Sequence, residues 1–162
     1  MRNMKFTLPK VLVKELEEKA SKAGVSVEEY LFDILIKELD PIEGFKKYIE
    51  GAEELLEEAR REFEKDNLRQ ASEKIWGACA LAIKAHALAR KGKRLESHAD
   101  LWVYKDEVAA ELGDWVRTAF KLANLMHVNF YENLATKKDV EDVLKEVEKL
   151  VKNIASSLEA IH

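Results

Sequence analysis

Four polar side chains that could bind a phosphate and a base recur at helical spacing in the second half of the chain. If this stretch is a helix, Lys121, Asn124, His127 and Tyr131 fall within a sector about 120° wide, at about 100° per residue. They supply a cation, an amide, an imidazole and a phenol. His127 is also the catalytic candidate, with Lys121, because an imidazole can act as a general acid or base near neutral pH. Alternatively, His127 and Tyr131 belong to a core in which their polar atoms are satisfied.

A basic loop, RKGKRLES (residues 90–97), forms a second candidate site. Its cations are Arg90, Lys91, Lys93 and Arg94. Ser97 is expected to cap a following helix, and the start of a helix presents free N–H groups with a partial positive charge. His98 stands at that same end. We therefore expect phosphate-bearing ligands to dock here, and the alternative is a solvated basic loop without a ligand.

The sequence contains no motif for several other kinds of functional site. The four histidines show no pair at metal-ligand spacing beside a cysteine or carboxylate cluster, so no metal site is expected. No glycine-rich phosphate loop and no Ser-His-Asp signature occur, and no cofactor is expected. His86 lies on an apolar helical stripe and is interpreted as a core histidine with satisfied nitrogens. The single cysteine, Cys79, is interpreted as a small core residue.

Composition indicates one ordinary domain, or a small module with a compact one. The chain has 162 residues, 47% of them hydrophobic, and a net charge of −4, which is not the strongly basic balance typical of nucleic-acid binders. No apolar run approaches the roughly 18 residues that span a bilayer, and no signal peptide is recognised, so we expect no membrane association and a cytoplasmic location. The many Lys and Glu residues favour a thermophilic source.

The residues expected to position these side chains are helical. Residues 68–89 are apolar almost all the way round, which predicts a central helix with neighbours on both sides. Apolar stripes and capping residues predict further helices on both sides of it, over residues 41–65, 98–112, 115–133 and from 137 toward the C-terminus. These five helices define an antiparallel bundle over residues 40–162.

The first 39 residues read as strand, helix, turn and helix. Residues 4–8 alternate apolar and polar side chains, as a strand does. A helix is predicted over residues 10–23, Gly24 stops it, and Ser26 starts a second helix. Its apolar side is expected to consist of Tyr30, Leu31, Ile34, Leu35 and Leu39. The strand has no partner elsewhere in the chain, which predicts pairing with a second copy and hence a homodimer or higher homo-oligomer.

This stretch resembles a ribbon-helix-helix module of the Arc and MetJ class, through KFTLP, VLVKELEEKA, AGVS and VEEYLFDILIKEL. The resemblance implies a dimerisation module whose strand can enter the DNA major groove. The DNA-contact candidates would be Asn3, Lys5 and Thr7. Residues 1–39 carry seven basic and seven acidic side chains, however, and a neutral module gains little affinity from phosphates. Dimerisation alone and packing as an N-terminal extension remain the other interpretations.

A second resemblance covers residues 42 to about 155. The blocks KIWGACALAIKAHALARKGKRLESH and LANLMHVNFYENL resemble the archaeal PaREP family. The helix layout is similar to that of HEPN domains, the "higher eukaryotes and prokaryotes nucleotide-binding" class. This resemblance implies an all-α HEPN-like bundle and partners that include nucleotides, RNA or DNA, or a nucleotidyltransferase-type protein.

Many HEPN proteins are metal-independent ribonucleases in which an Arg and a later His on one late helix are separated by four to six residues. His127 takes the His position, but the matching residues include no Arg, and only Lys121 is basic. A lysine does not reproduce the planar bidentate grip of arginine on a phosphate. We therefore favour a non-catalytic homodimeric binding protein. A toxin-like ribonuclease and a ribbon-helix-helix DNA-binding regulator are the alternatives.

Overall fold

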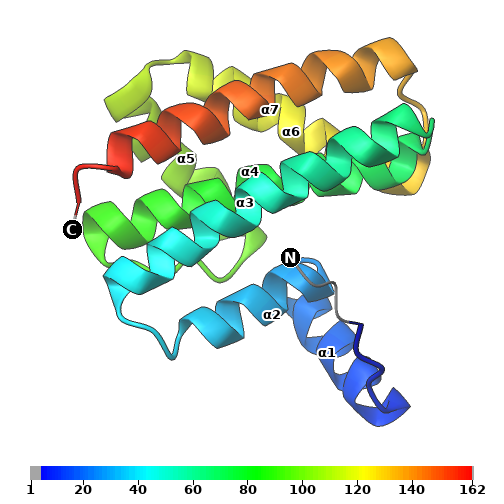
Figure 1. Cartoon of the computed structure of the whole chain (residues 1–162), viewed down its shortest axis with the longest axis horizontal. Coiled ribbons are helices and arrows are strands. Elements are labelled where there is room, and N and C mark those ends of the chain that lie inside the picture. Colours follow the sequence, from blue (N-terminus) through cyan, green and yellow to red (C-terminus); the bar gives the residue numbers. More distant parts are fainter. Residues whose placement is uncertain (1–4, 162) are drawn as a thin grey trace.

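A computed structural model of the chain describes residues 5–161, which form seven helices and no strand (Figure 1). No helix in this range is both long and apolar enough to cross a membrane. The predicted all-α fold is confirmed. The helices are α1 (Lys10–Ala23), α2 (Val27–Ile36), α3 (Pro41–Glu64), α4 (Leu68–Lys91), α5 (His98–Leu112), α6 (Trp115–Glu132) and α7 (Lys137–Leu158).

Helix α4 is the core of a five-helix bundle, as its composition predicts. It packs along α3 and also contacts α5, α6 and α7, so side chains on all its faces are buried (Figure 1). Ala78, Ala80 and Ala82 are fully buried, and such small side chains let neighbouring helices approach closely. The larger core side chains, among them Trp76 and Phe120, fill the space between helices.

Side-chain caps fix the starts of several helices, which explains why the sequence locates them well. Asp40 Oδ1 accepts a hydrogen bond from the Glu43 N–H at 2.9 Å, and Ser97 Oγ accepts one from the Asp100 N–H at 3.1 Å. Thr136 forms a reciprocal capping box at the start of α7. Each cap satisfies a backbone N–H group that has no partner inside the helix.

The expected N-terminal strand is not seen in this chain. Residues 5–9 have no regular secondary structure, and Met4 lies outside the described residues. The physical reason is that a strand needs a second strand to pair its backbone groups, and residues 5–161 of one chain contain none. Pairing with a second copy stays a prediction.

The apolar side of α2 is largely exposed. Leu35, assigned to that side, is 68% exposed, and Ile34 is 39% exposed. The side that faces the bundle carries Glu29 and Asp33 instead, which are 3% and 6% exposed. The apolar side predicted for α2 therefore does not pack on the bundle, because the two carboxylates on the opposite side pair with a buried cation there.

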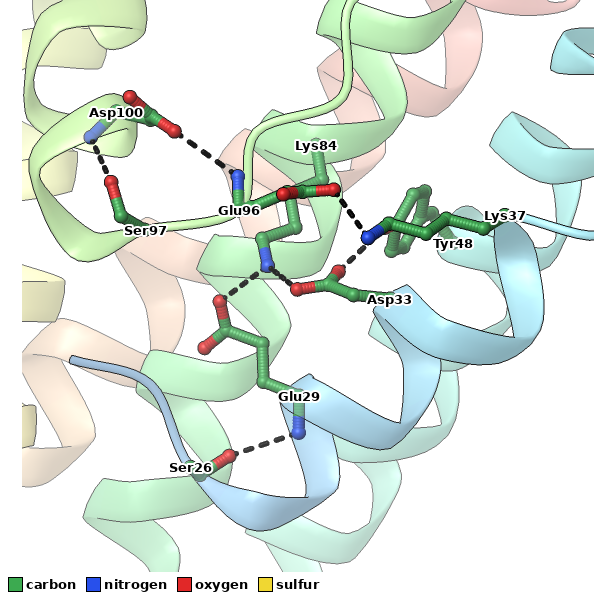
Figure 2. Close-up of polar contacts among 9 residues, drawn as sticks. All are labelled: Ser26, Glu29, Asp33, Lys37, Tyr48, Lys84, Glu96, Ser97 and Asp100. Carbon is green, nitrogen blue, oxygen red and sulfur yellow. Dashed lines mark hydrogen bonds and ion pairs between the residues drawn. The ribbon is translucent and has the colours of Figure 1, made fainter. Parts of the chain in front are cut away.

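That cation is Lys84, in the apolar middle of α4 (Figure 2). Its Nζ lies 2.6 Å from Asp33 Oδ2 and 2.7 Å from Glu29 Oε2, and its side chain is 1% exposed. The Tyr48 hydroxyl of α3 donates a hydrogen bond of 2.6 Å to the other Asp33 oxygen. Burial and the Asp33 charge raise the pKa of Tyr48, so this hydroxyl keeps its proton. We call Glu29, Asp33, Tyr48 and Lys84 the Lys84 cluster.

Further contacts hold α2 against the bundle. The Phe32 ring lies over Gly51 of α3 so closely that a Cβ at Gly51 would fall 2.6 Å from the ring. Arg94, from the loop before α5, donates hydrogen bonds to the carbonyl oxygens of Ile36 and Leu39. By contrast, α1 projects away from the bundle (Figure 1). The division of the chain at residue 39 into two domains stays a prediction.

We expect Lys84→Met to destabilise the protein by about 3–5 kcal/mol, because it leaves two buried carboxylates without their cation. Lys74→Met is the matched control, since Lys74 also pairs two carboxylates, Glu28 and Glu58, but is 23% exposed. There we expect a loss of at most about 1 kcal/mol. Chemical denaturation of both variants measures the difference, and equal losses would contradict the structural role of the Lys84 cluster.

Candidate functional site

Two histidines that lie far apart in the sequence meet beside a buried tryptophan. His98 is the first residue of α5, placed there by the Ser97 cap, and His127 lies on α6. Their ring centroids are 5.6 Å apart, and both rings contact Trp76 of α4, at 5.2 and 5.5 Å. Trp76 is 1% exposed, so its ring forms the floor against which both imidazoles rest.

Trp102 fixes the protonation state of His98. The Trp102 Nε1–H group donates a hydrogen bond of 3.0 Å to His98 Nε2. An indole can only donate, so His98 Nε2 must keep its lone pair and the ring proton must sit on Nδ1. Burial, followed by the neighbouring His127, lowers the pKa of His98, and nearby Asn124 opposes part of this shift. His98 is therefore a neutral N–H donor at pH 7.

His127 has a different environment. Its Nδ1 lies 3.7 Å from Glu73 Oε1 of α4, and the two side chains are 22% and 18% exposed. This Nδ1 is buried and has no hydrogen bond from the described residues. The Tyr131 ring stands edge-on to the imidazole at 5.7 Å and is itself 68% exposed. The expectation that His127 and Tyr131 share one side of α6 is confirmed, and the core alternative does not hold for Tyr131.

Three buried polar atoms gather at this site: His98 Nδ1, Asn124 Oδ1 and His127 Nδ1. None reaches ordinary hydrogen-bond geometry with a residue in the described range. Buried polar groups in native proteins are normally paired, so each unpaired group calls for an explanation. His98 Nδ1–H and Asn124 Oδ1 are a donor and an acceptor, and a hydrogen bond with Asn124 raises the pKa of His98, so these two atoms can serve each other. The unused capacity is chiefly that of His127, beside an exposed aromatic ring.

Lys121, the cation assigned to this site, lies farther off. It is exposed and precedes His127 by six residues, which is about 9 Å along a helix axis. A ligand would have to extend over two turns of α6 to contact both side chains. The structure thus groups Asn124, His127 and Tyr131 with His98 more closely than with Lys121.

In the basic loop, the two arginine side chains have hydrogen-bond partners within the described part of the chain, and the two lysine side chains do not. Arg90 forms two hydrogen bonds of 2.9 Å with Glu111 and a third with the Ser157 carbonyl oxygen, and Arg94 binds the end of α2 as described above. Lys91 and Lys93 are exposed, and over residues 5–161 no carboxylate lies within ion-pair distance of them. Docking of a phosphate at this loop would therefore rest chiefly on the two lysines.

The remaining predicted residues have simpler environments. His86 is buried, with Nδ1 2.8 Å from the Tyr104 hydroxyl and Nε2 3.0 Å from Glu111 Oε1, so its interpretation as a satisfied core histidine is confirmed. Lys5 and Thr7 are exposed, and Asn3 lies outside the described residues. Across the described range, no group of three or more His, Cys, Asp and Glu side chains could hold a metal ion.

Two residues near His127 were missed by the sequence analysis, Glu73 and Arg69. They are four residues apart on α4, so they lie on one side of that helix. Arg69 Nε donates a hydrogen bond of 2.8 Å to the Phe130 carbonyl oxygen of α6. The i, i+4 spacing was visible in the sequence, but which helix this side faces depends on the packing of α4 against α6.

The protein is an all-helical bundle with a polar site where α4, α5 and α6 meet. A family model for the Archaeal PaREP1/PaREP8 family matches residues 47–151, and the chain belongs to this family. The predicted family is thereby confirmed. A crystal structure of a Sulfolobus solfataricus protein is similar, with a TM-score of 0.61 and 28% sequence identity over 67% of this chain and 97% of that one. No curated protein matches the chain.

The tautomer of His98 is directly testable. We expect nitrogen-resolved NMR of the wild type at pH 7 to show a neutral His98 ring with its proton on Nδ1. In Trp102→Phe the indole donor is gone, so Nε2 becomes free to carry the proton and the signals should shift toward the other tautomer. His86 signals serve as the internal control and should not change. A wild-type proton on Nε2 would contradict the assignment.

Proposed function

We propose that this protein is a non-catalytic homodimeric binding protein of the HEPN-like kind, whose ligand is a nucleotide or single-stranded nucleic acid. The observation that carries the proposal is the group of His98, Asn124 and His127, whose two imidazoles meet on Trp76 beside the exposed Tyr131 ring and whose polar atoms lack full hydrogen-bond geometry. A ligand that supplies hydrogen-bond donors and acceptors would satisfy them. The alternative ligand is a partner protein that inserts a polar side chain into the site.

The chemistry of the site favours a base with a phosphate attached. Exposed aromatic rings stack on unpaired bases, and Tyr131 offers such a ring next to His127. No strongly basic surface is needed for a ligand of this size, which fits the net charge of −4.

The homodimer is supported by apolar side chains on the N-terminal segment, α1 and α2. Phe6 is 79% exposed, Val11 74% and Leu35 68%. A large exposed apolar patch usually marks an interface, and a second copy offers the same patch for a two-fold contact. A ribbon-helix-helix arrangement would also pair the backbone of residues 4–8. The neutral charge of residues 1–39 favours dimerisation over DNA binding through Asn3, Lys5 and Thr7.

One observation favours the ribonuclease alternative. The Glu73–His127 contact at 3.7 Å places a carboxylate beside a partly exposed imidazole, an arrangement that suits a general base. We place it second because Lys121 lies too far along α6 to share one phosphate with His127 directly. Catalysis that used both Lys121 and His127 would therefore require a longer substrate.

The test is binding and cleavage of a single-stranded RNA of about ten nucleotides, a length within the usual range for such sites. We expect the wild type to bind and His127→Ala to bind about tenfold more weakly, because a hydrogen bond from the imidazole is lost. The RNA should stay intact with and without a chelator. Asn153→Ala is the control, since Asn153 is exposed on α7 and bonds only within its own helix.

Two outcomes would contradict this function. If neither RNA nor nucleotides bind the wild type, the site is not a nucleotide site. If the RNA is cut and the cutting disappears in His127→Ala, the protein is a ribonuclease, and the Glu73–His127 pair becomes its catalytic core.

A further inference from the structure

Arg69 of α4 is held in place at the edge of the candidate site although it is exposed. Its Nε–H donates to the Phe130 carbonyl oxygen at 2.8 Å, and its Cζ lies 5.6 Å from the centroid of the Phe130 ring. The first contact fixes one edge of the guanidinium and the second fixes its plane, through a cation–π interaction. An exposed arginine restrained in this way has already lost much of the conformational freedom that ligand binding would remove.

The two terminal nitrogens of Arg69 remain available. A guanidinium has five N–H donors, and the contact with Phe130 occupies one of them. Over residues 5–161, no carboxylate lies within ion-pair distance of this side chain, and Nε is its only hydrogen-bonding atom. Arginine binds phosphate through two parallel N–H bonds, and its charge does not depend on pH in the physiological range.

Arg69 also lies close to His127 along the line where α4 meets α6. Glu73 contacts His127, while Arg69, four residues earlier on α4, contacts Phe130, three residues later on α6. The two contacts are therefore one helical turn apart, about 5–6 Å. This separation suits the phosphate and the adjoining sugar or base of one nucleotide. Lys121 is on the opposite side of His127 along α6 and farther away.

We propose that Arg69 is the phosphate-binding residue of this site. The terminal nitrogens of Arg69 hold a phosphate of a nucleotide or RNA, the His127 ring contacts the same ligand, and its base lies against Tyr131. The inference rests on the proposed binding function and names its phosphate contact. The Glu73 carboxylate would repel an anion, so the phosphate lies on the solvent side of Arg69, away from the Glu73–His127 contact.

The experiment compares Arg69→Gln with the wild type, using the same RNA, adenosine 5′-monophosphate and adenosine as probes. We expect Arg69→Gln to bind the RNA and the nucleotide about tenfold more weakly, since a charge-assisted bond to phosphate is lost. Adenosine has no phosphate, so its affinity should be the same for both proteins. The salt dependence of RNA binding should become shallower by about 0.7 in the log–log slope, as expected for one lost phosphate contact on a single strand.

Arg117→Gln is the matched control. It removes the same charge from an exposed arginine of α6, ten residues from His127 and so about 15 Å along the axis. We expect wild-type affinity for all three probes. Equal melting temperatures of the variants would show that each is folded.

The outcomes separate this inference from the function on which it rests. Wild-type RNA binding that weakens in His127→Ala but not in Arg69→Gln would overturn the role of Arg69 and leave the binding function standing. Equal losses in Arg69→Gln and Arg117→Gln would show a general charge effect and would also overturn it. Absence of any binding by the wild type would remove both.

Discussion

The buried contact between Lys84 and two carboxylates of α2 is the constraint on which the arrangement of this molecule depends. An uncompensated charge at the centre of α4 would cost several kcal/mol, so Lys84 requires its partners as long as the bundle is folded. The partners come from outside the bundle, on α2, and are joined by the Tyr48 hydroxyl of α3 (Figure 2). Three helices are thereby held together at one buried point, where α2 turns both of its carboxylates toward Lys84.

This orientation determines what the N-terminal part of the chain presents to solvent. Because Glu29 and Asp33 face inward, the apolar residues on the other side of α2 face outward, and Leu35 is 68% exposed. The segment before α1 and the first turn of α1 add Phe6 and Val11 to the exposed apolar residues. The same contacts place the α1–α2 turn beside the ligand site, where a Cβ at Gly24 would lie 3.2 Å from the His98 Cβ. The proposed dimer surface and the histidine site thus belong to neighbouring parts of one packed structure.

The helices could be predicted from the sequence because their signals are local. Asp40, Ser97 and Thr136 cap helices through hydrogen bonds three residues along, and the small apolar residues of α4 indicate burial on every side. The orientation of α2 could not be predicted in this way, since two acidic residues on an amphipathic helix usually indicate a solvated face. The isolated Lys84 in an apolar run was the one available signal that a buried carboxylate must come from elsewhere.

In the candidate site, too, contacts within one helix could be predicted from the sequence, and contacts between helices could not. The pairing of His127 with Tyr131 follows from helical spacing, and it is present in the structure. The meeting of His98 with His127 on Trp76 depends on how α4, α5 and α6 pack, and so do the positions of Glu73 and Arg69. Two arginines of the basic loop, Arg90 and Arg94, bind partners from distant segments, which no local pattern reveals.

The central claim is that the Lys84 cluster turns an apolar face of α2 outward to form a homodimer. Sedimentation equilibrium of the wild type, Leu35→Lys and Leu125→Lys tests it most directly, because Leu125 is similarly exposed, at 55%, but lies on α6. We predict a dimer for the wild type and Leu125→Lys and a folded monomer for Leu35→Lys, since a lysine charge would be buried in the interface. A monomeric wild type, or a dimer lost only in Leu125→Lys, would contradict the account.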